Sequence, residues 1–185
     1  TVLDYLSKID TSGRQLLDFI EKVLDVTWTE SNDTRISETE CSLTAIIQDI
    51  YNSFRQKAEE KNIHFSTDLS ALTHYDVYGD PEKISHLLRN LVSNAINFTN
   101  PGGMVSIAAT ETKNLASSYA TFQFIIKDNG IGISETFMEH LFTPFEREKN
   151  TTFSGIHGTG LSLAITKNIV TMMGGQIEVN STEGE

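Results

Sequence analysis

Apolar positions along the chain recur at two spacings, and these predict an alternation of helices and strands. In residues 43–58 and 84–98 they recur every three or four residues, the spacing of one face of an amphipathic helix. In residues 120–127 they alternate with polar residues, as in a half-buried strand. Shorter patterns predict a last helix at 161–173 and strands at 63–68, 75–78 and 104–111 and from Gln176 onward. Helices on one face of a mixed sheet give an α+β fold, a two-layer α/β sandwich.

The N-terminal residues carry a different pattern. Apolar or small residues alternate by four and three from Val2 to Thr27, which is a heptad seam, and further leucines widen it to the face of a bundle helix. We therefore expect a long bundle-forming helix in residues 1–28, a polar linker in 29–40 and a compact domain in 41–185. Such a helix buries its face against partner helices. Packing on the domain that follows is the alternative.

Three asparagines lie on the helix predicted after Asp80. Asp80 is a good N-cap and Pro81 suits the first turn. On a helical wheel Asn90, Asn94 and Asn97 fall in one narrow arc beside the apolar stripe. Amide oxygens suit Mg²⁺, which keeps few protein ligands and takes its others from water and phosphates, so we assign Asn94 as the metal ligand. The alternative is that the amides are solvated or cap neighbouring backbone, and for Asn97, near the helix end, both interpretations stay open.

The sequence Asp-Asn-Gly-Ile-Gly follows the predicted strand at 120–127 directly. Continuing the alternation places Asp128 on the same face as the strand's phenylalanines. A carboxylate aimed at a core needs a hydrogen-bond donor, and the exocyclic amine of adenine is one. Gly130 and Gly132 would let the backbone turn and approach a flat ligand closely. An ordinary Asp-Asn-Gly turn is the alternative if the motif is taken alone.

A second group of glycines, from Gly155 to Gly160, precedes the helix predicted at 161–173. Glycines before a helix leave backbone N–H groups to face an anion, and the helix dipole favours negative charge there. No Gly-Lys-Ser/Thr follows, so the motif is not a Walker P-loop, and no Rossmann fingerprint is present. A flexible loop is the alternative for this motif alone. The asparagines, Asp128 and these glycines, taken in order, predict an ATP site.

Four of these segments resemble the motifs of sensor histidine kinases. Residues 91–99 are similar to the N box of that family, 128–132 to the first glycine box, 141–145 to the F box and 158–163 to the second glycine box. The resemblance implies the ATP-binding domain shared with gyrase, the Hsp90 chaperones and the mismatch-repair ATPases. It also implies that the helix at 1–28 is the second helix of the dimerisation and histidine-phosphotransfer hairpin. Because the family usually continues with a further strand after residue 180, the domain is expected to be C-terminally truncated.

The resemblance implies roles for individual residues. Asn94 would hold Mg²⁺, Asp128 would hold the adenine amine, and a lid spanning about residues 134–157 would cover the phosphates. Within that lid Arg147 and Lys149 are the cations most able to reach a triphosphate, and we assign Arg147 as the catalytic one; a solvated surface role is the alternative for either. Asn90 takes the place where hydrolytic relatives carry a glutamate; because an amide is no general base, transfer is favoured over hydrolysis. Further nucleotide contacts are implied for Asn97, Phe98, Gly130, Gly132, Ile133, Phe145, Gly158, Thr159, Gly160, Leu161 and Ser162.

Two positions depart from the family pattern. Asn97 stands where the family usually has a basic residue that contacts phosphate, so we expect weaker nucleotide binding unless Arg147 takes over. Ser162 stands where a third glycine is usual, and its hydroxyl would add a bond or crowd the site. Because of these two departures, the alternative that the chain is a catalytically weak or degenerate ATP-binding regulatory module of the same fold stays open.

The expected activity is transfer of the ATP γ-phosphate to a histidine of the dimerisation domain, for relay to a response regulator aspartate. None of the five histidines has the family's phosphoacceptor context, so the acceptor is expected outside these residues. The expected partners are a second copy, through the N-terminal helix bundle, and a response regulator receiver domain. A conformational ATPase or a serine kinase on the same fold is a further alternative.

Composition narrows the classes of function. The net charge of −11 argues against nucleic-acid binding, which usually needs a basic face. No run approaches the ~20 apolar residues of a membrane span, so we expect no membrane contact by these residues, while attachment of the parent protein stays open. The single cysteine, Cys41, excludes an internal disulfide and suits the reducing cytoplasm.

Overall fold

The computed structural model of the chain describes residues 5, 13, 36–113, 120–148 and 159–184. Apart from residues 5 and 13, the bundle helix predicted for residues 1–28 lies outside the described residues, and so does most of the linker predicted for 29–40. The helices are α2 (Leu43–Glu60), α3 (Pro81–Phe98), the short α4 (Glu135–Met138) and α6 (Ser162–Met172). The strands are β1 (Thr39–Ser42), β2 (His64–Ala71), β3 (Asp76–Gly79), β4 (Met104–Lys113) and β5 (Ala120–Asp128).

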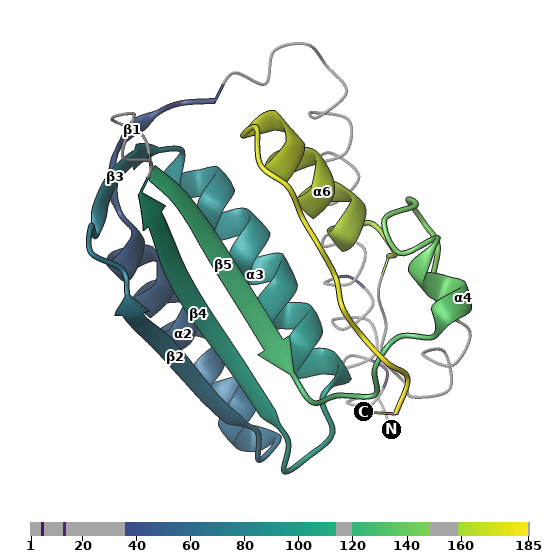
Figure 1. Ribbon diagram of the computed structural model, residues 1–185. Helices are drawn as coiled ribbons and strands as arrows, with labels where there is room; N and C mark the ends of the chain where they lie inside the picture. Colours follow the sequence, from purple (N-terminus) through teal and green to yellow (C-terminus); the bar gives the residue numbers. More distant parts are fainter. Residues whose placement is uncertain (1–4, 6–12, 14–35, 114–119, 149–158, 185) are drawn as a thin grey trace.

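The described strands form two sheets. β2 pairs parallel with β4, and β4 pairs antiparallel with β5, which places Val105 opposite Asp128 at the end of β5. β1 and β3 form a separate antiparallel pair. Figure 1 shows α2, α3 and α6 together on one face of the three-stranded sheet, which confirms the α+β arrangement of helices against a mixed sheet.

The core lies between the helices and the sheet. The elements α2, α3, β4 and α6 each contribute side chains that are at most 1% exposed: Leu43, Ile47, Ile50, Leu88, Ile96, Ile107 and Ile165. α3 begins as predicted, because the Asp80 carboxylate accepts a hydrogen bond from the Lys83 amide at 3.0 Å. The same carboxylate accepts from the Ser37 amide at 3.0 Å, so it also fastens the chain ahead of β1 to the start of α3.

Two elements differ from the prediction. β1 was not predicted, and its first residues, Thr39 and Glu40, fall in the stretch expected as linker. The strand expected from Gln176 is absent: residues 176–180 are not in a strand, although Ile177 and Val179 are half-buried and their neighbours exposed. Alternation alone does not make a strand, because a strand also needs a hydrogen-bonded partner. Among the described residues, none donates or accepts a backbone hydrogen bond with residues 176–182.

In the described part of the chain, every helix is too short or too polar to serve as a membrane span.

A carboxylate on β4 anchors the loop between β2 and β3. Glu111 Oε2 accepts from the Thr73 hydroxyl at 2.6 Å and from the Thr73 and His74 amides, each at 2.9 Å. The Nδ1 atom of His74 lies 2.7 Å from Oε1. These donors, the Thr73 hydroxyl first, lower the pKa of Glu111 from 4.5 to about 2. The charged carboxylate therefore stabilises the fold.

We expect Glu111→Gln to make stability less sensitive to acid. A folded-state pKa below the ordinary value means that the stabilisation is fully present above pH 4.5 and is lost as the pH falls toward about 2. Urea unfolding of both proteins at several pH values in this window measures the difference. The variant should be less stable at neutral pH, and its free energy of unfolding should change less with pH. Equal slopes for both proteins would contradict the anchoring role.

Candidate nucleotide-binding site

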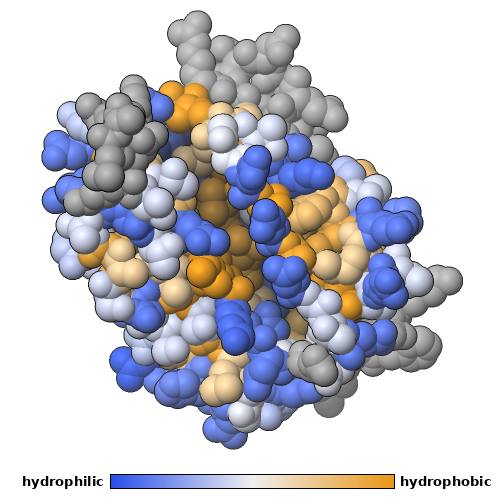
Figure 2. Space-filling model, viewed as in Figure 1, coloured by the Kyte–Doolittle hydropathy of each residue, from blue (hydrophilic) through white to orange (hydrophobic). Residues whose placement is uncertain are grey.

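A single large cleft connects the segments that carry the predicted site. Its volume is about 2130 Å³, and it is lined by α3, by all of β5, by residues around the start of α6 and by residues 173–181. In Figure 2 it is a hollow with a hydrophobic floor bordered by hydrophilic side chains. Typical ligand pockets hold roughly 300–1,000 Å³. A nucleotide would therefore fill only one part of this cleft, and the rest extends along the edge of β5 that pairs with no described strand.

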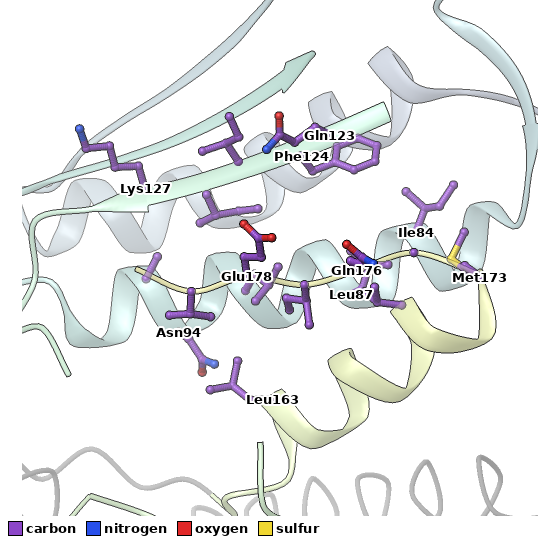
Figure 3. Close-up of a pocket in the computed structure, with 18 of the residues that line it drawn as sticks. Ile84, Leu87, Asn94, Gln123, Phe124, Lys127, Leu163, Met173, Gln176 and Glu178 are labelled. Carbon is purple, nitrogen blue, oxygen red and sulfur yellow. The ribbon is translucent and has the colours of Figure 1, made fainter. Parts of the chain in front are cut away.

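Asn94 and Asp128 both line this cleft, although they come from different layers of the fold. Asn94 is half-buried on α3, and Figure 3 shows its amide directed toward α6, near Leu163. No described residue forms a hydrogen bond with this amide, so its oxygen is available to a ligand in the cleft. The other two amides of this helix differ: the Asn90 amide nitrogen is buried, and the Asn97 amide oxygen accepts a hydrogen bond from Lys57.

Asp128 ends β5 with its carboxylate exposed to the cleft. One oxygen, Oδ1, accepts from the Gly130 amide at 2.9 Å, which holds the side chain in a local turn. Among the described residues no donor reaches the other oxygen, so the carboxylate keeps an acceptor for a ligand amine. The predicted phase of β5 is confirmed, because Phe122, Phe124 and Ile126 are half-buried and the residues between them are exposed.

Glycine is required at two positions beside the cleft. Gly132 has a φ of +70°, and a Cβ there would collide with the carbonyl oxygen of Thr182. Gly160 has a φ of +72°, and a Cβ there would lie 2.8 Å from the carbonyl oxygen of Glu146. Since L-residues with side chains avoid positive φ, both positions favour glycine on conformational grounds as well. The glycines therefore let separate backbone segments pack at the rim of the cleft.

We expect Gly132→Ala to destabilise the protein more than Gly102→Ala. Both glycines have positive φ, +70° and +85°, but a Cβ at Gly102 meets nothing within 4 Å. Gly102→Ala should cost about 1–2 kcal/mol for the left-handed backbone alone. Gly132→Ala adds the clash with Thr182 and should cost about 1 kcal/mol more, in line with overpacking. Thermal or urea unfolding measures both, and equal losses would contradict the packing of residues 182–184 against the glycine box.

Comparison with known proteins decides the family. Residues 79–185, more than half of the chain, match the family described as histidine kinase-, DNA gyrase B- and HSP90-like ATPases. The chain belongs to this family. The match covers α3, β5, α6 and most of the residues that line the cleft, on which the predicted site rests.

Relatives with known names place this ATPase domain among histidine kinases. It is 34% identical over 180 residues to hybrid signal transduction histidine kinase C of Dictyostelium discoideum, covering 96% of this chain and 14% of that protein. It is also 34% identical over 183 residues to sensor histidine kinase GacS of Pseudomonas protegens, covering 99% of this chain and 20% of that protein. The chain therefore spans about a fifth or less of these relatives' length.

Two solved structures share the fold. Full-length ShkA, crystallised in complex with AMPPNP, superposes with a TM-score of 0.82 at 22% identity, covering 98% of this chain and 36% of that chain. Histidine kinase ThkA, in complex with response regulator protein TrrA, superposes with a TM-score of 0.64 at 23% identity, covering 91% of this chain and 46% of ThkA.

The other predicted site residues of the histidine kinase-type ATPase domain fall into three groups. One group lines the cleft with Asn94 and Asp128: Phe98, Gly132, Ile133, Arg147, Thr159, Gly160 and Ser162. A second group lies outside the lining: Asn90, Asn97, Gly130, Phe145 and Leu161. Gly158 and the part of the predicted lid at 149–157 lie outside the described residues.

The second group has identifiable structural surroundings. Leu161 is 0% exposed and belongs to the core, and Phe145 is 62% exposed at a φ of +66°. The Asn90 amide nitrogen is buried and has no partner among the described residues. Buried donors are normally hydrogen-bonded, so this one, one turn before Asn94, is an exception. Asn97 is engaged with Lys57, whose ammonium lies 2.7 Å from its Oδ1.

The start of α6 is open to an anion. Its N-cap position, Leu161, forms no side-chain cap, so first-turn N–H groups are left for a ligand. Thr159, Gly160 and Ser162 line the cleft at this end. The predicted phosphate position would lie here.

Sequence reasoning missed the contacts that hold the base of the predicted lid. Glu148 Oε1 accepts from the Ser134 amide at 3.1 Å and ties the start of the predicted lid to a residue within it. The Lys167 ammonium of α6 lies 5.0 Å from the centre of the Phe142 ring, a cation–π contact. Neither pair is spaced in a way that a local pattern reveals, because the partners are 14 and 25 residues apart.

The donors present suit Mg²⁺ bound together with a nucleotide. In the described ranges no three His, Cys, Asp or Glu side chains gather to hold a metal alone. The amide oxygen of Asn94, without a partner in the described part of the chain, is a ligand of the kind that Mg²⁺ takes alongside water and phosphate oxygens. A metal held mainly by the nucleotide fits this donor set.

Proposed function

We propose that this domain binds Mg-ATP in the cleft and transfers the γ-phosphate to a histidine of its parent's dimerisation domain. The observation that carries the proposal is that Asn94 and Asp128 open onto one cleft. Asp128 would accept a hydrogen bond from the adenine amine at one end. Asn94 would contribute an oxygen to Mg²⁺ bound by the phosphates, beside the uncapped start of α6.

The chemistry then depends on position and charge. Phosphoryl transfer moves the γ-phosphoryl group of ATP to an in-line nucleophile, with ADP as the leaving group, and catalysis comes mainly from alignment and charge neutralisation. Arg147 lines the cleft and would offset negative charge on the phosphates. Asn90 cannot accept a proton from water, which disfavours hydrolysis. A neutral imidazole nitrogen carries its own lone pair, so a histidine acceptor needs no such base.

The proposed partners follow from the same activity. The parent protein would act as a homodimer through the bundle helix predicted at 1–28, which would bring an acceptor histidine to the cleft. The phosphoryl group would then pass to an aspartate of a response regulator receiver domain. The related kinase ThkA was crystallised with its response regulator, which supports this class of partner.

A regulatory nucleotide-binding module is the second candidate. It is favoured by Asn97, an amide where the related kinases usually carry a basic residue, and by Ser162, a hydroxyl at the start of α6. Such a module would bind Mg-ATP and change its contacts with a partner without phosphoryl transfer.

Radiolabelled ATP separates the two candidates. The full-length protein is incubated with γ-labelled Mg-ATP, with an Asp128→Asn variant as control. The kinase proposal predicts label on the protein that is stable in base and labile in acid, as expected for a phosphohistidine, and its absence in the variant. Mg-ATP binding by calorimetry without any transfer would favour the regulatory module. No Mg-ATP binding would overturn both.

A further inference from the structure

Lys57 of α2 and Lys61, the C-cap residue that follows this helix, reach across to the last turn of α3. The Lys61 ammonium donates to the carbonyl oxygens of Ile96 and Asn97, at 2.9 and 2.7 Å. The Lys57 ammonium donates to the side-chain oxygen of Asn97 at 2.7 Å. The Asn97 amide nitrogen in turn donates to the Ser93 hydroxyl at 3.5 Å. Two positive charges therefore lie at the same end of α3 as Asn94.

Only one of these lysines is explained by the fold. Lys61 is partly buried, and it satisfies carbonyl groups that every helix leaves without partners at its C-terminus. Lys57 is exposed, and its partner is a side-chain amide rather than a helix carbonyl. Within the described residues no carboxylate lies in ion-pair distance of it.

The local electrostatics favour an anion near Lys57. The pKa of Lys61 is lowered, first by burial and then by the charge of Lys57, so the two ammonium groups repel one another. When no carboxylate lies between two such charges, an anion that binds between or beside them reduces their repulsion.

The cleft supplies the direction from which an anion would come. Asn97 follows Asn94 by three residues on α3, and side chains at that spacing are neighbours on the helix surface, with Cβ atoms about 5–6 Å apart. Lys57 and Asn97 do not line the cleft, but Asn97 lies three residues after Asn94, a lining residue, on α3. The flexible four-carbon stem of lysine would let the Lys57 ammonium group reach from Asn97 toward a phosphate held at Asn94.

We propose that Lys57 binds the terminal phosphates of the nucleotide, reaching the site from α2 and held in place by Asn97. This inference rests on the proposed function, since it needs a nucleotide whose phosphates lie beside Asn94. It gives Asn97 a positioning role. Instead of contacting phosphate itself, the Asn97 side chain accepts a hydrogen bond from the Lys57 ammonium group and holds it near the phosphates. The ligand class is a nucleoside triphosphate, because adenosine has no group that reaches Lys57.

Calorimetric titrations of Lys57→Gln test the assignment. We expect the affinity for Mg-ATP to fall about five- to tenfold, the loss of one charge-assisted hydrogen bond at a partly solvated position. Adenosine affinity should stay within twofold of wild type. Arg55→Gln is the matched control, since it removes the same charge from the same helix, where Arg55 pairs with Glu59 at 2.7 Å. That control should change Mg-ATP affinity by less than twofold.

A second substitution distinguishes phosphate binding from a structural role. In the Lys57→Gln background, Asn97→Lys restores an ammonium group at the same place from α3, and Mg-ATP affinity should recover to within about threefold of wild type. Equal Mg-ATP affinity of wild type and Lys57→Gln would overturn the inference and leave the proposed function standing. An equal loss for adenosine and Mg-ATP would also overturn it. Failure of the wild-type protein to bind Mg-ATP would overturn the proposed function itself.

Discussion

Replacing Asp128 with asparagine is expected to weaken the binding of ATP, ADP and adenosine alike, by about tenfold or more. Asparagine has the same shape and can still accept from the Gly130 amide, so the turn at the end of β5 should persist. Its other terminal atom becomes an NH₂ group, which would face the adenine amine donor to donor. Losing a hydrogen bond to a charged acceptor costs about 1.5–3 kcal/mol, which corresponds to roughly a 10- to 150-fold loss of affinity.

Calorimetry with the three ligands measures this effect. Asp49→Asn is a suitable control, because it makes the same change of charge at an exposed position of α2, away from the cleft. Thermal unfolding should show that Asp128→Asn remains folded. If adenosine bound the variant as tightly as wild type, Asp128 would have no part in recognising the base.

Replacing Asn94 with alanine is expected to affect a different set of ligands. The substitution removes the amide oxygen assigned to Mg²⁺, so Mg-ATP affinity should fall about tenfold or more, as for other charge-assisted contacts. Adenosine affinity should change little, because the base lies at the Asp128 end. The fold should persist, since Asn94 is half-buried at the edge of the core and forms no hydrogen bond with any described residue.

The metal dependence of the Asn94 effect is the decisive readout. ATP binding is measured with Mg²⁺ and with a chelator, for wild type, Asn94→Ala and the control Asn52→Ala, whose amide is exposed on α2. Wild type and Asn52→Ala should lose affinity in the chelator, and Asn94→Ala should be nearly insensitive to it. An undiminished Mg²⁺ effect in Asn94→Ala would remove this residue from the metal site.

Local chemistry in the sequence was sufficient to predict α3 and β5. Asp80 and Pro81 fix the start of α3, and Asn100-Pro101-Gly102 follows its end, so the structure has the helix where the sequence predicts it. Alternation with period two fixed the phase of β5 through Phe124. Signals of this kind depend on a few neighbouring residues, and for that reason they can be read without the fold.

Properties that depend on distant residues could not be predicted. The helical wheel put Asn94 and Asn97 in one arc. Only the packing of α2 against α3 shows that the ammonium group of Lys57, 40 residues away in the sequence, donates a hydrogen bond to the Asn97 side chain. The prediction of a strand from Gln176 was wrong for the same reason: the alternation of apolar and polar residues is present, but no described strand pairs with this segment. β1 was missed because its partner β3 lies 37 residues further along the chain.

One titration tests the central claim, that Asp128 and Asn94 belong to one nucleotide site. Isotope-labelled protein is titrated with Mg-ADP while NMR follows the backbone amides of Gly130 and Gly132 and the side-chain amide of Asn94. The account predicts that all three signals shift with the same Kd, and that replacing Mg²⁺ with paramagnetic Mn²⁺ broadens the Asn94 amide most. Signals that move with different Kd values, or an Asn94 amide that does not respond, would contradict it.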